Sequence, residues 1–135
     1  MKKRVFISMI VAFLAMGVAF SACAQDKTTG FTIQRLVVAT GIEDREPVGA
    51  ADTFPADTPK VYCFLEVVHV EQDTNVTFAW IHEGKEIHRT ALVLKAGSRW
   101  RTRAEKTLHQ ATGHWKVEIR DAEGQVLKEV SFTVE

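Results

Sequence analysis

Short stretches of Val, Ile, Phe and Trp, each closed by Gly, Pro or Asp, recur along this sequence from Phe31 to Val134. β-Branched and aromatic side chains suit a pleated strand, and Gly and Asp accept the backbone geometry of tight turns. This spacing is typical of all-β domains, and no stretch is convincing as a helix. The expected strands are 31–42, 61–70, 76–82, 86–94, 98–108, 114–121 and 126–134.

Alternation within these strands indicates which side chains form the core. In 114–121, Trp115, Val117 and Ile119 share one face, and the charged or polar residues share the other. The strand 76–82 alternates in the same way, with Phe78 and Trp80 on its apolar face. We therefore expect an immunoglobulin-like two-sheet sandwich of about seven strands, with a small barrel as the alternative.

One long connection interrupts the pattern. Residues 43–60 contain all three prolines of the chain, and proline cannot donate to a strand ladder, so a loop or a sheet edge is expected there.

Cys63 stands in the apolar run 61–70, where a free thiol behaves as a small hydrophobic side chain. A chain of this size buries roughly two-thirds of its unfolded surface, which is enough for one core without a disulfide.

The amino-terminal residues have the layout of a bacterial-type signal peptide. Basic residues within 1–4 precede an uncharged apolar stretch over 5–20, and small residues follow. The apolar stretch is slightly short for a membrane-spanning helix, and a permanent anchor helix is the alternative. The sequence predicts export, with a signal peptide over 1–23, a tether over 24–30 and the β-sandwich domain over 31–135.

Two kinds of processing fit these residues. Ala22, Cys23 and Ala24 form an A-x-A cleavage pattern that would free the domain in the periplasm. Phe20 to Cys23 resembles a lipobox, in which Cys23 would carry lipid and attach the protein to a membrane, the outer membrane where one exists. Phe20 stands where lipoboxes usually carry Leu, Val or Ile, and both interpretations stay open.

The charge distribution argues against nucleic acid as a partner. The chain has 17 Lys+Arg and 17 Asp+Glu, but three of the basic residues precede Cys23, so the remainder has 14 basic against 17 acidic residues. Clustered positive charge supplies most of the affinity for nucleic acid. A net charge of −3 without a basic tail does not suit that class of partner.

Four blocks of the sequence carry a family resemblance. They are Arg45-Glu46-Pro47-Val48 with Phe54-Pro55; Val61-Tyr62 and Trp80 with Gly84-Lys85; Trp100-Arg101-Thr102 with Lys106; and Gly113 to Val117 with Gly124 and Phe132. In this order, from about Leu36 to Val134, they resemble the bacterial domain-of-unknown-function family 2914. The resemblance implies a small all-β sandwich, exported or attached to a membrane, and it brings no known chemistry.

Two positions depart from the family pattern. The family usually has His two residues before the strand Trp, where this sequence has Phe78. After Trp100-Arg101-Thr102 the family tends to continue with another aromatic and small hydroxyl residues, whereas Arg103, Ala104 and Glu105 stand here. The resemblance therefore implies that a site built on those groups is altered or absent.

Three arginines alternate along the expected strand 98–108. Arg99, Arg101 and Arg103 fall on one face, where their guanidinium groups would suit a carboxylate, a phosphate or a sulfated sugar. The acidic net charge instead favours a solvated face whose arginines pair with Glu86 or Glu118 on neighbouring strands. The candidate ligand-binding residues are Arg99, Trp100, Arg101, Arg103, Lys106, Trp80 and His82.

The tryptophans form either part of a core or a platform for sugar rings and peptides. Trp80 and Trp115 continue apolar faces, which favours the core for both. Trp100 alternates with the arginines, so its place is ambiguous.

No catalytic or metal-binding constellation stands out. No H-x-H or H-x-x-x-H pair occurs among the five histidines, His69, His82, His88, His109 and His114. No serine stands in a nucleophile-elbow motif such as G-x-S-x-G, and the cysteines do not have the C-x-x-C spacing of a zinc site. We therefore expect no enzyme, no metal and no cofactor.

These observations favour a non-catalytic, exported β-sandwich that binds an unidentified protein or ligand of the bacterial cell envelope. The alternative is a domain that senses a small ligand, a carbohydrate or an anion through Trp100 and the face of Arg99, Arg101 and Arg103.

Overall fold

A computed structural model of the chain describes residues 30–135. The predicted signal peptide, Cys23 and most of the predicted tether lie outside the described residues. Among the residues described, no helix is long and apolar enough to cross a membrane. The strands are β1 (Thr32–Ala39), β2 (Gly41–Glu43), β3 (Glu46–Val48), β4 (Thr53–Phe54), β5 (Lys60–Val70), β6 (Thr74–His82), β7 (Lys85–Leu94), β8 (Gly97–Thr107), β9 (Gly113–Arg120) and β10 (Val126–Val134).

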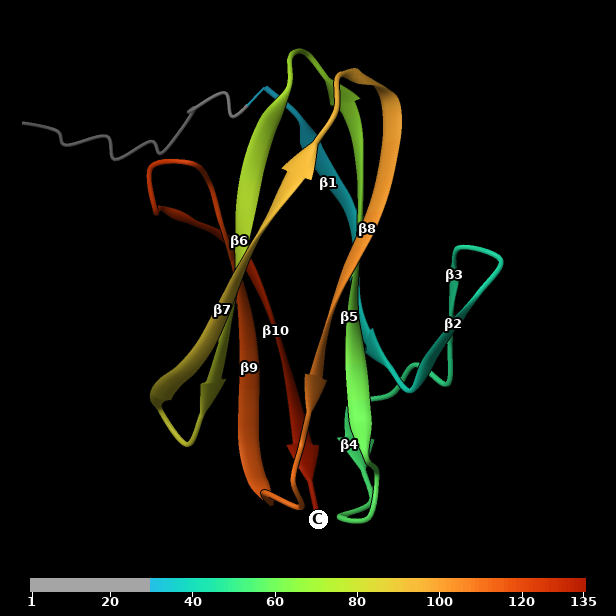
Figure 1. Cartoon of the computed structure of the whole chain (residues 1–135), viewed down its shortest axis with the longest axis vertical. Coiled ribbons are helices and arrows are strands. Elements are labelled where there is room, and N and C mark those ends of the chain that lie inside the picture. The colour runs from blue at the N-terminus through green and yellow to red at the C-terminus, as the bar shows by residue number, and fades with distance from the viewer. Residues whose placement is uncertain (1–29) are drawn as a thin grey trace, which may run out of the picture.

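Two sheets face each other across one core, as Figure 1 shows. One has three strands in the order β1-β5-β8, and the other has five in the order β4-β10-β9-β6-β7. All pairings within them are antiparallel except that of β4 with β10. The predicted two-sheet sandwich is therefore confirmed, and the barrel alternative is wrong.

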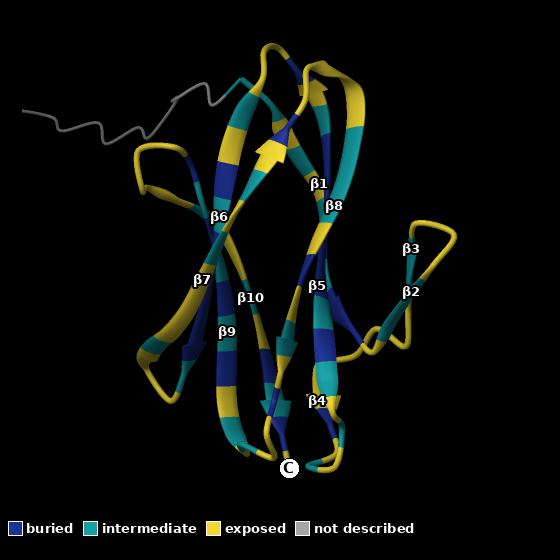
Figure 2. Ribbon diagram, in the orientation of Figure 1, coloured by how far each residue is buried: buried dark blue, intermediate teal, exposed yellow. Residues whose placement is uncertain are grey.

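The core lies between the inner faces of the two sheets, and buried positions run along β5, β6 and β9 (Figure 2). Trp80 and Trp115, both predicted as core, are 0% and 2% exposed. The indole N–H of Trp115 donates to the carbonyl oxygen of Ala111 at 3.0 Å, and its ring stacks on Phe132 with 5.7 Å between centroids. Cys63 is buried in this core, and burial raises the pKa of its thiol, so it behaves as the predicted small apolar side chain.

The predicted irregular connection over 43–60 contains regular structure after all. The expected first strand breaks at Thr40, where the chain leaves the sandwich to form the β2–β3 hairpin. This hairpin projects beside the three-stranded sheet (Figure 1). Pro47 is tolerated in β3 because that strand has a ladder on one side only. The short strand β4 then pairs in parallel with the end of β10.

A ladder of alternating charges covers the outer face of the five-stranded sheet. Its members, which we call the charge ladder, are Lys116, Glu118, Arg120, Glu129, Glu86 and Arg89. Three cations and three carboxylates balance within it. Beneath the ladder lie Ala79 and Ile81, which are buried although they point away from the core.

Candidate functional site

Strand register places one carboxylate between arginines on the outer face of the three-stranded sheet. Glu66 of β5 stands opposite Arg35 of β1 on one side and opposite Arg101 of β8 on the other. The β1 ladder has an irregularity between Ile33 and Arg35 that skips Gln34. Without this bulge Gln34 would oppose Glu66, so the bulge aims Arg35 at the carboxylate.

Glu66 binds three guanidinium groups while its side chain is only 4% exposed. Its Oε1 lies 2.7 Å from Nε of Arg35, and its Oε2 lies 3.1 Å from Nε of Arg99 and 3.5 Å from Nε of Arg101. The hydrogen bond from Arg35 and the nearby Arg101 hold the pKa of Glu66 below its usual range. Glu66 is therefore a fixed negative charge at the centre of the sheet face.

A second carboxylate joins the β2–β3 hairpin to this face. Glu46 of β3 accepts two hydrogen bonds from Arg35, at 2.8 Å and 3.1 Å, and lies 3.4 Å from Nη1 of Arg101. The bidentate bond from Arg35 lowers the pKa of Glu46, while Glu46 and Glu66 together raise the pKa of Arg35. The hairpin is thus held beside the sheet by ion pairs.

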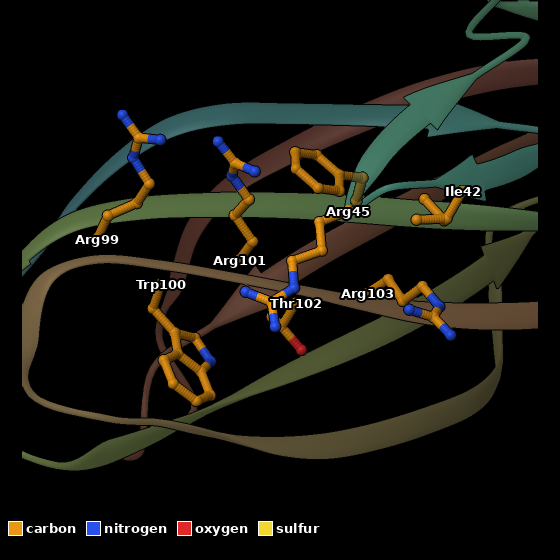
Figure 3. A pocket seen from close by; sticks show the side chains of 8 residues that line it. Ile42, Arg45, Arg99, Trp100, Arg101, Thr102 and Arg103 are labelled. Carbon is orange, nitrogen blue, oxygen red and sulfur yellow. The ribbon is translucent and has the colours of Figure 1, made fainter.

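Between the hairpin and β8 lies a cleft of about 560 Å³ that we call the arginine cleft. Its lining residues are Ile42, Arg45, Phe64, Arg99, Trp100, Arg101, Thr102 and Arg103. In Figure 3 the side chain of Arg45 extends from the hairpin across β8, toward Thr102. The hairpin and the edge of the sheet therefore build the cleft together.

The arginine cleft follows the open edge of β8. Successive residues of a strand point to opposite faces of the sheet, so Trp100 and Thr102 point away from Arg99, Arg101 and Arg103. Both sets nevertheless line the cleft, and Figure 3 shows Arg99 and Arg101 on one side of the β8 ribbon and Trp100 and Thr102 on the other. Within the described part of the chain β8 pairs with β5 on one side and with no strand on the other.

Positive charge in and around this cleft exceeds negative charge. Glu46 and Glu66 are the two carboxylates that bind its arginines, whereas five guanidinium groups gather there: Arg35, Arg45, Arg99, Arg101 and Arg103. Among the described residues Arg45 and Arg103 form no ion pair, and Arg103 lies over the ring of Tyr62 at 5.9 Å. The cleft therefore carries about three uncompensated positive charges, unlike the balanced charge ladder on the other sheet.

One hydrogen-bond donor in the lining lacks an acceptor. The indole Nε1 of Trp100 is buried without a partner, while the ring packs against the edge of the core. A buried donor that has lost water and gained no acceptor destabilises the fold. The Trp100 ring is therefore partly buried against the core and partly exposed in the cleft, and its N–H is an unused donor beside the cleft.

The structure separates the predicted site residues. It brings together Arg99, Trp100, Arg101 and Arg103, with the three guanidinium groups on one face as predicted. Lys106 donates to the carbonyl oxygen of Thr107 and does not line the cleft. Trp80 is buried in the core, and His82 on the other sheet packs on Trp115 and bonds to Thr112.

The predicted partners of the arginine row are wrong. Glu86 and Glu118 belong to the charge ladder and pair with Arg120, because β7 and β9 are in the opposite sheet. The true partners are Glu66 and Glu46. The sequence does carry a signal for Glu66, because it is a carboxylate inside the largely apolar run 61–70 and a buried acid needs a cation. Arg45 gave no comparable signal.

The remaining candidate groups do not converge on a second site. The described residues contain no group of three or more His, Cys, Asp or Glu side chains suited to a metal ion.

Comparison with known proteins identifies the fold more clearly than the activity. An immunoglobulin-like protein from Pseudomonas aeruginosa superposes with a TM-score of 0.51 at 19% identity, covering 85% of this chain and all of that one. A β-glucosidase from Listeria innocua matches with a TM-score of 0.48 at 9% identity, over 77% of this chain but 15% of the enzyme. The first likeness supports the immunoglobulin-like architecture, and the second supports no argument about function.

The sequence comparisons agree with the resemblance found in the motifs. No curated protein matches the chain. The sequence model of a family described as "Protein of unknown function (DUF2914)" matches residues 73–134. This match includes the third and fourth motif blocks, while Arg45 to Pro55 and Val61-Tyr62 precede it.

Proposed function

We propose that this chain, whose residues 73–134 belong to the DUF2914 family, has a non-catalytic binding role. In this role the arginine cleft receives an anionic group of a partner. The observation that carries this proposal is the excess of guanidinium groups over carboxylates in the cleft. Arg45 and Arg103, which form no ion pair among the described residues, are free to bind a ligand. A cluster of arginines on one face suits bidentate binding of carboxylate or phosphate.

The chemistry of the lining supports binding rather than catalysis. The cleft is lined by guanidinium groups, apolar side chains and one hydroxyl, that of Thr102. The carboxylates beside it are neutralised by arginine, which lowers their pKa values and makes them poor general bases. A turnover of esters, glycosides or phosphates by the purified domain at ordinary enzymatic rates would overturn this part of the proposal.

We place this role in the bacterial cell envelope on the strength of the amino-terminal sequence. The basic, apolar and small segments over 1–24 support export, and Cys23 supports attachment by lipid if the lipobox is used. The intact mass of the native protein tests this. Added lipid mass at Cys23 indicates a lipoprotein, a start at Gln25 indicates a free periplasmic domain, and a start at Met1 overturns both.

Anion binding is tested by titrating inorganic phosphate, citrate, heparin fragments and polyglutamate at constant ionic strength, with thermal unfolding as the readout. A ligand that binds only the folded state raises the melting temperature. The double substitution Arg45→Gln and Arg103→Gln should abolish the rise without exposing a partner carboxylate. Lys85→Gln with Lys128→Gln removes the same charge from exposed positions outside the cleft. Equal shifts in both double variants, or no shift with any anion, would overturn the cleft as the site.

A further inference from the structure

We propose that the partner of the arginine cleft is an extended acidic peptide segment that adds to β8 as a further strand. This inference rests on the proposed function, because it names the class of ligand that the cleft receives. It follows from the position of the cleft along an open strand edge, which supplies a second set of binding groups besides the arginines.

The edge of β8 offers backbone hydrogen bonds that a peptide can complete. In an antiparallel pair, alternate residues direct their N–H and C=O groups away from the partner strand. β8 runs from Gly97 to Thr107 with β5 on one side, and among the described residues no backbone group bonds to its other edge between Ser98 and Lys106. Peptide ligands often bind such edges by adding a strand, with main-chain bonds for affinity and side-chain pockets for specificity.

The arginine spacing specifies the peptide. Arg99, Arg101 and Arg103 repeat every second residue, which is the period of side chains on one face of any strand added alongside. A peptide with Glu or Asp at alternate positions would place its carboxylates opposite these guanidinium groups. Its intervening side chains would fall on the side of Trp100 and Thr102, where apolar or small polar residues fit. Arg45 would cover the added strand from the hairpin.

Charge complementarity favours this occupant over two others. A second copy of the chain pairing β8 with β8 would set one arginine row against another, and like charges directly opposite destabilise a sheet. A sulfated sugar or free phosphate would satisfy the guanidinium groups but has no strand backbone for the open edge. Both alternatives make different predictions in the experiment below.

The experiment measures the binding of short synthetic peptides to the protein by isothermal calorimetry. The first peptide alternates Glu and Val over seven residues, and the second has the same composition with the acids in one block. We expect at least tenfold weaker binding of the block peptide. Methylating alternate backbone nitrogens of the first peptide, in each of the two registers, should weaken binding at least tenfold in one register and little in the other.

The protein variants separate this inference from the proposed function. Arg45→Gln with Arg103→Gln should weaken the alternating peptide, and Lys85→Gln with Lys128→Gln should not. Equal binding of the alternating, block and both methylated peptides, all lost in the cleft variant, would keep the anion site but reject strand addition. No peptide binding while heparin fragments or phosphate bind at the cleft would assign the cleft to a non-peptide anion. Dimerisation that is lost in the cleft variant would assign the edge to a second copy.

Discussion

Glu66 shows how one residue links folding to the candidate site. Its carboxylate is nearly inaccessible, yet it stays ionised because three arginines from two neighbouring strands surround it. Breaking a buried ion pair leaves an uncompensated charge, which usually destabilises strongly. Here Arg35 and Arg99 are 36% and 54% exposed, so water compensates part of the loss.

Glu66→Gln should lower the free energy of unfolding by about 1–3 kcal/mol at pH 7. The folded-state pKa of Glu66 is lowered, so its contribution is present above the unfolded pKa of about 4.3 and is lost as pH falls through the folded value. The variant should therefore lose less stability than the parent between pH 7 and pH 3. Denaturant unfolding at both pH values measures this. Equal acid sensitivity would contradict it, because only Glu46 and the other carboxylates would then account for the pH dependence.

Two tryptophans form a matched pair that isolates one hydrogen bond. Trp115 donates its N–H to Ala111, whereas the buried Nε1 of Trp80 has no partner. Replacing either with Phe removes similar buried volume, but only Trp115→Phe leaves a carbonyl unsatisfied. We expect Trp115→Phe to destabilise by about 1 kcal/mol more than Trp80→Phe in urea unfolding. The opposite order would mean that packing differences outweigh the hydrogen bond.

Trp115→Ala should lower the free energy of unfolding by about 3–5 kcal/mol, because it removes a buried aromatic side chain from the core.

Among the elements, the β2–β3 hairpin was the least predictable from sequence. Its turn places Asp44 at φ 51° and Arg45 at φ 64°, a left-handed pair that Asn-Gly normally supplies. The sequence Glu43-Asp44-Arg45-Glu46 contains no such signal, and the following prolines predict a loop. By contrast, Gly84 and Gly124 stand at positive φ in the short gaps between expected strands, 83–85 and 122–125, where glycine indicates a turn. Alternation predicted the strands well because it depends only on local period.

Arg45→Gly should stabilise the domain and weaken anion binding together. A non-glycine residue in the left-handed region is strained, and glycine relieves that strain while making the unfolded chain more flexible. The net gain should be about 0.5–1 kcal/mol in the free energy of unfolding. Arg45→Gln, which removes the same charge without relieving the backbone, should weaken binding with no gain in stability. If glycine gave neither a gain in stability nor a loss of binding, Arg45 would be neither strained nor functional.

At the scale of the whole molecule, the sequence predicted the architecture but not the pairing of strands across space. Trp80, Trp115 and Ile119 lie in the core as their alternation indicates. The same alternation says nothing about which sheet a strand joins, and so Arg101 was matched with acids of the wrong sheet. The partner Glu46 lies beyond a turn that local signals did not reveal.

A single core shared by both sheets predicts one cooperative unfolding transition. All three tryptophans contact this core, so their emission should lie in the blue in the folded protein and shift to the red on unfolding. The urea transitions followed by tryptophan emission and by far-ultraviolet circular dichroism should coincide. Separate midpoints would show that the two sheets unfold independently.

Ala79 has a consequence for how homologous sequences should vary. Glu86 stands opposite Ile81, and Arg120 stands opposite Thr77, so Ala79 lies between them on the same face of β6. The two charged side chains meet across that strand at 2.8 Å, which is feasible because alanine leaves the space above it open. Positions 79, 86 and 120 should then change together among homologous sequences. A coevolution signal between 86 and 120 would thus report a contact between strands that are not neighbours.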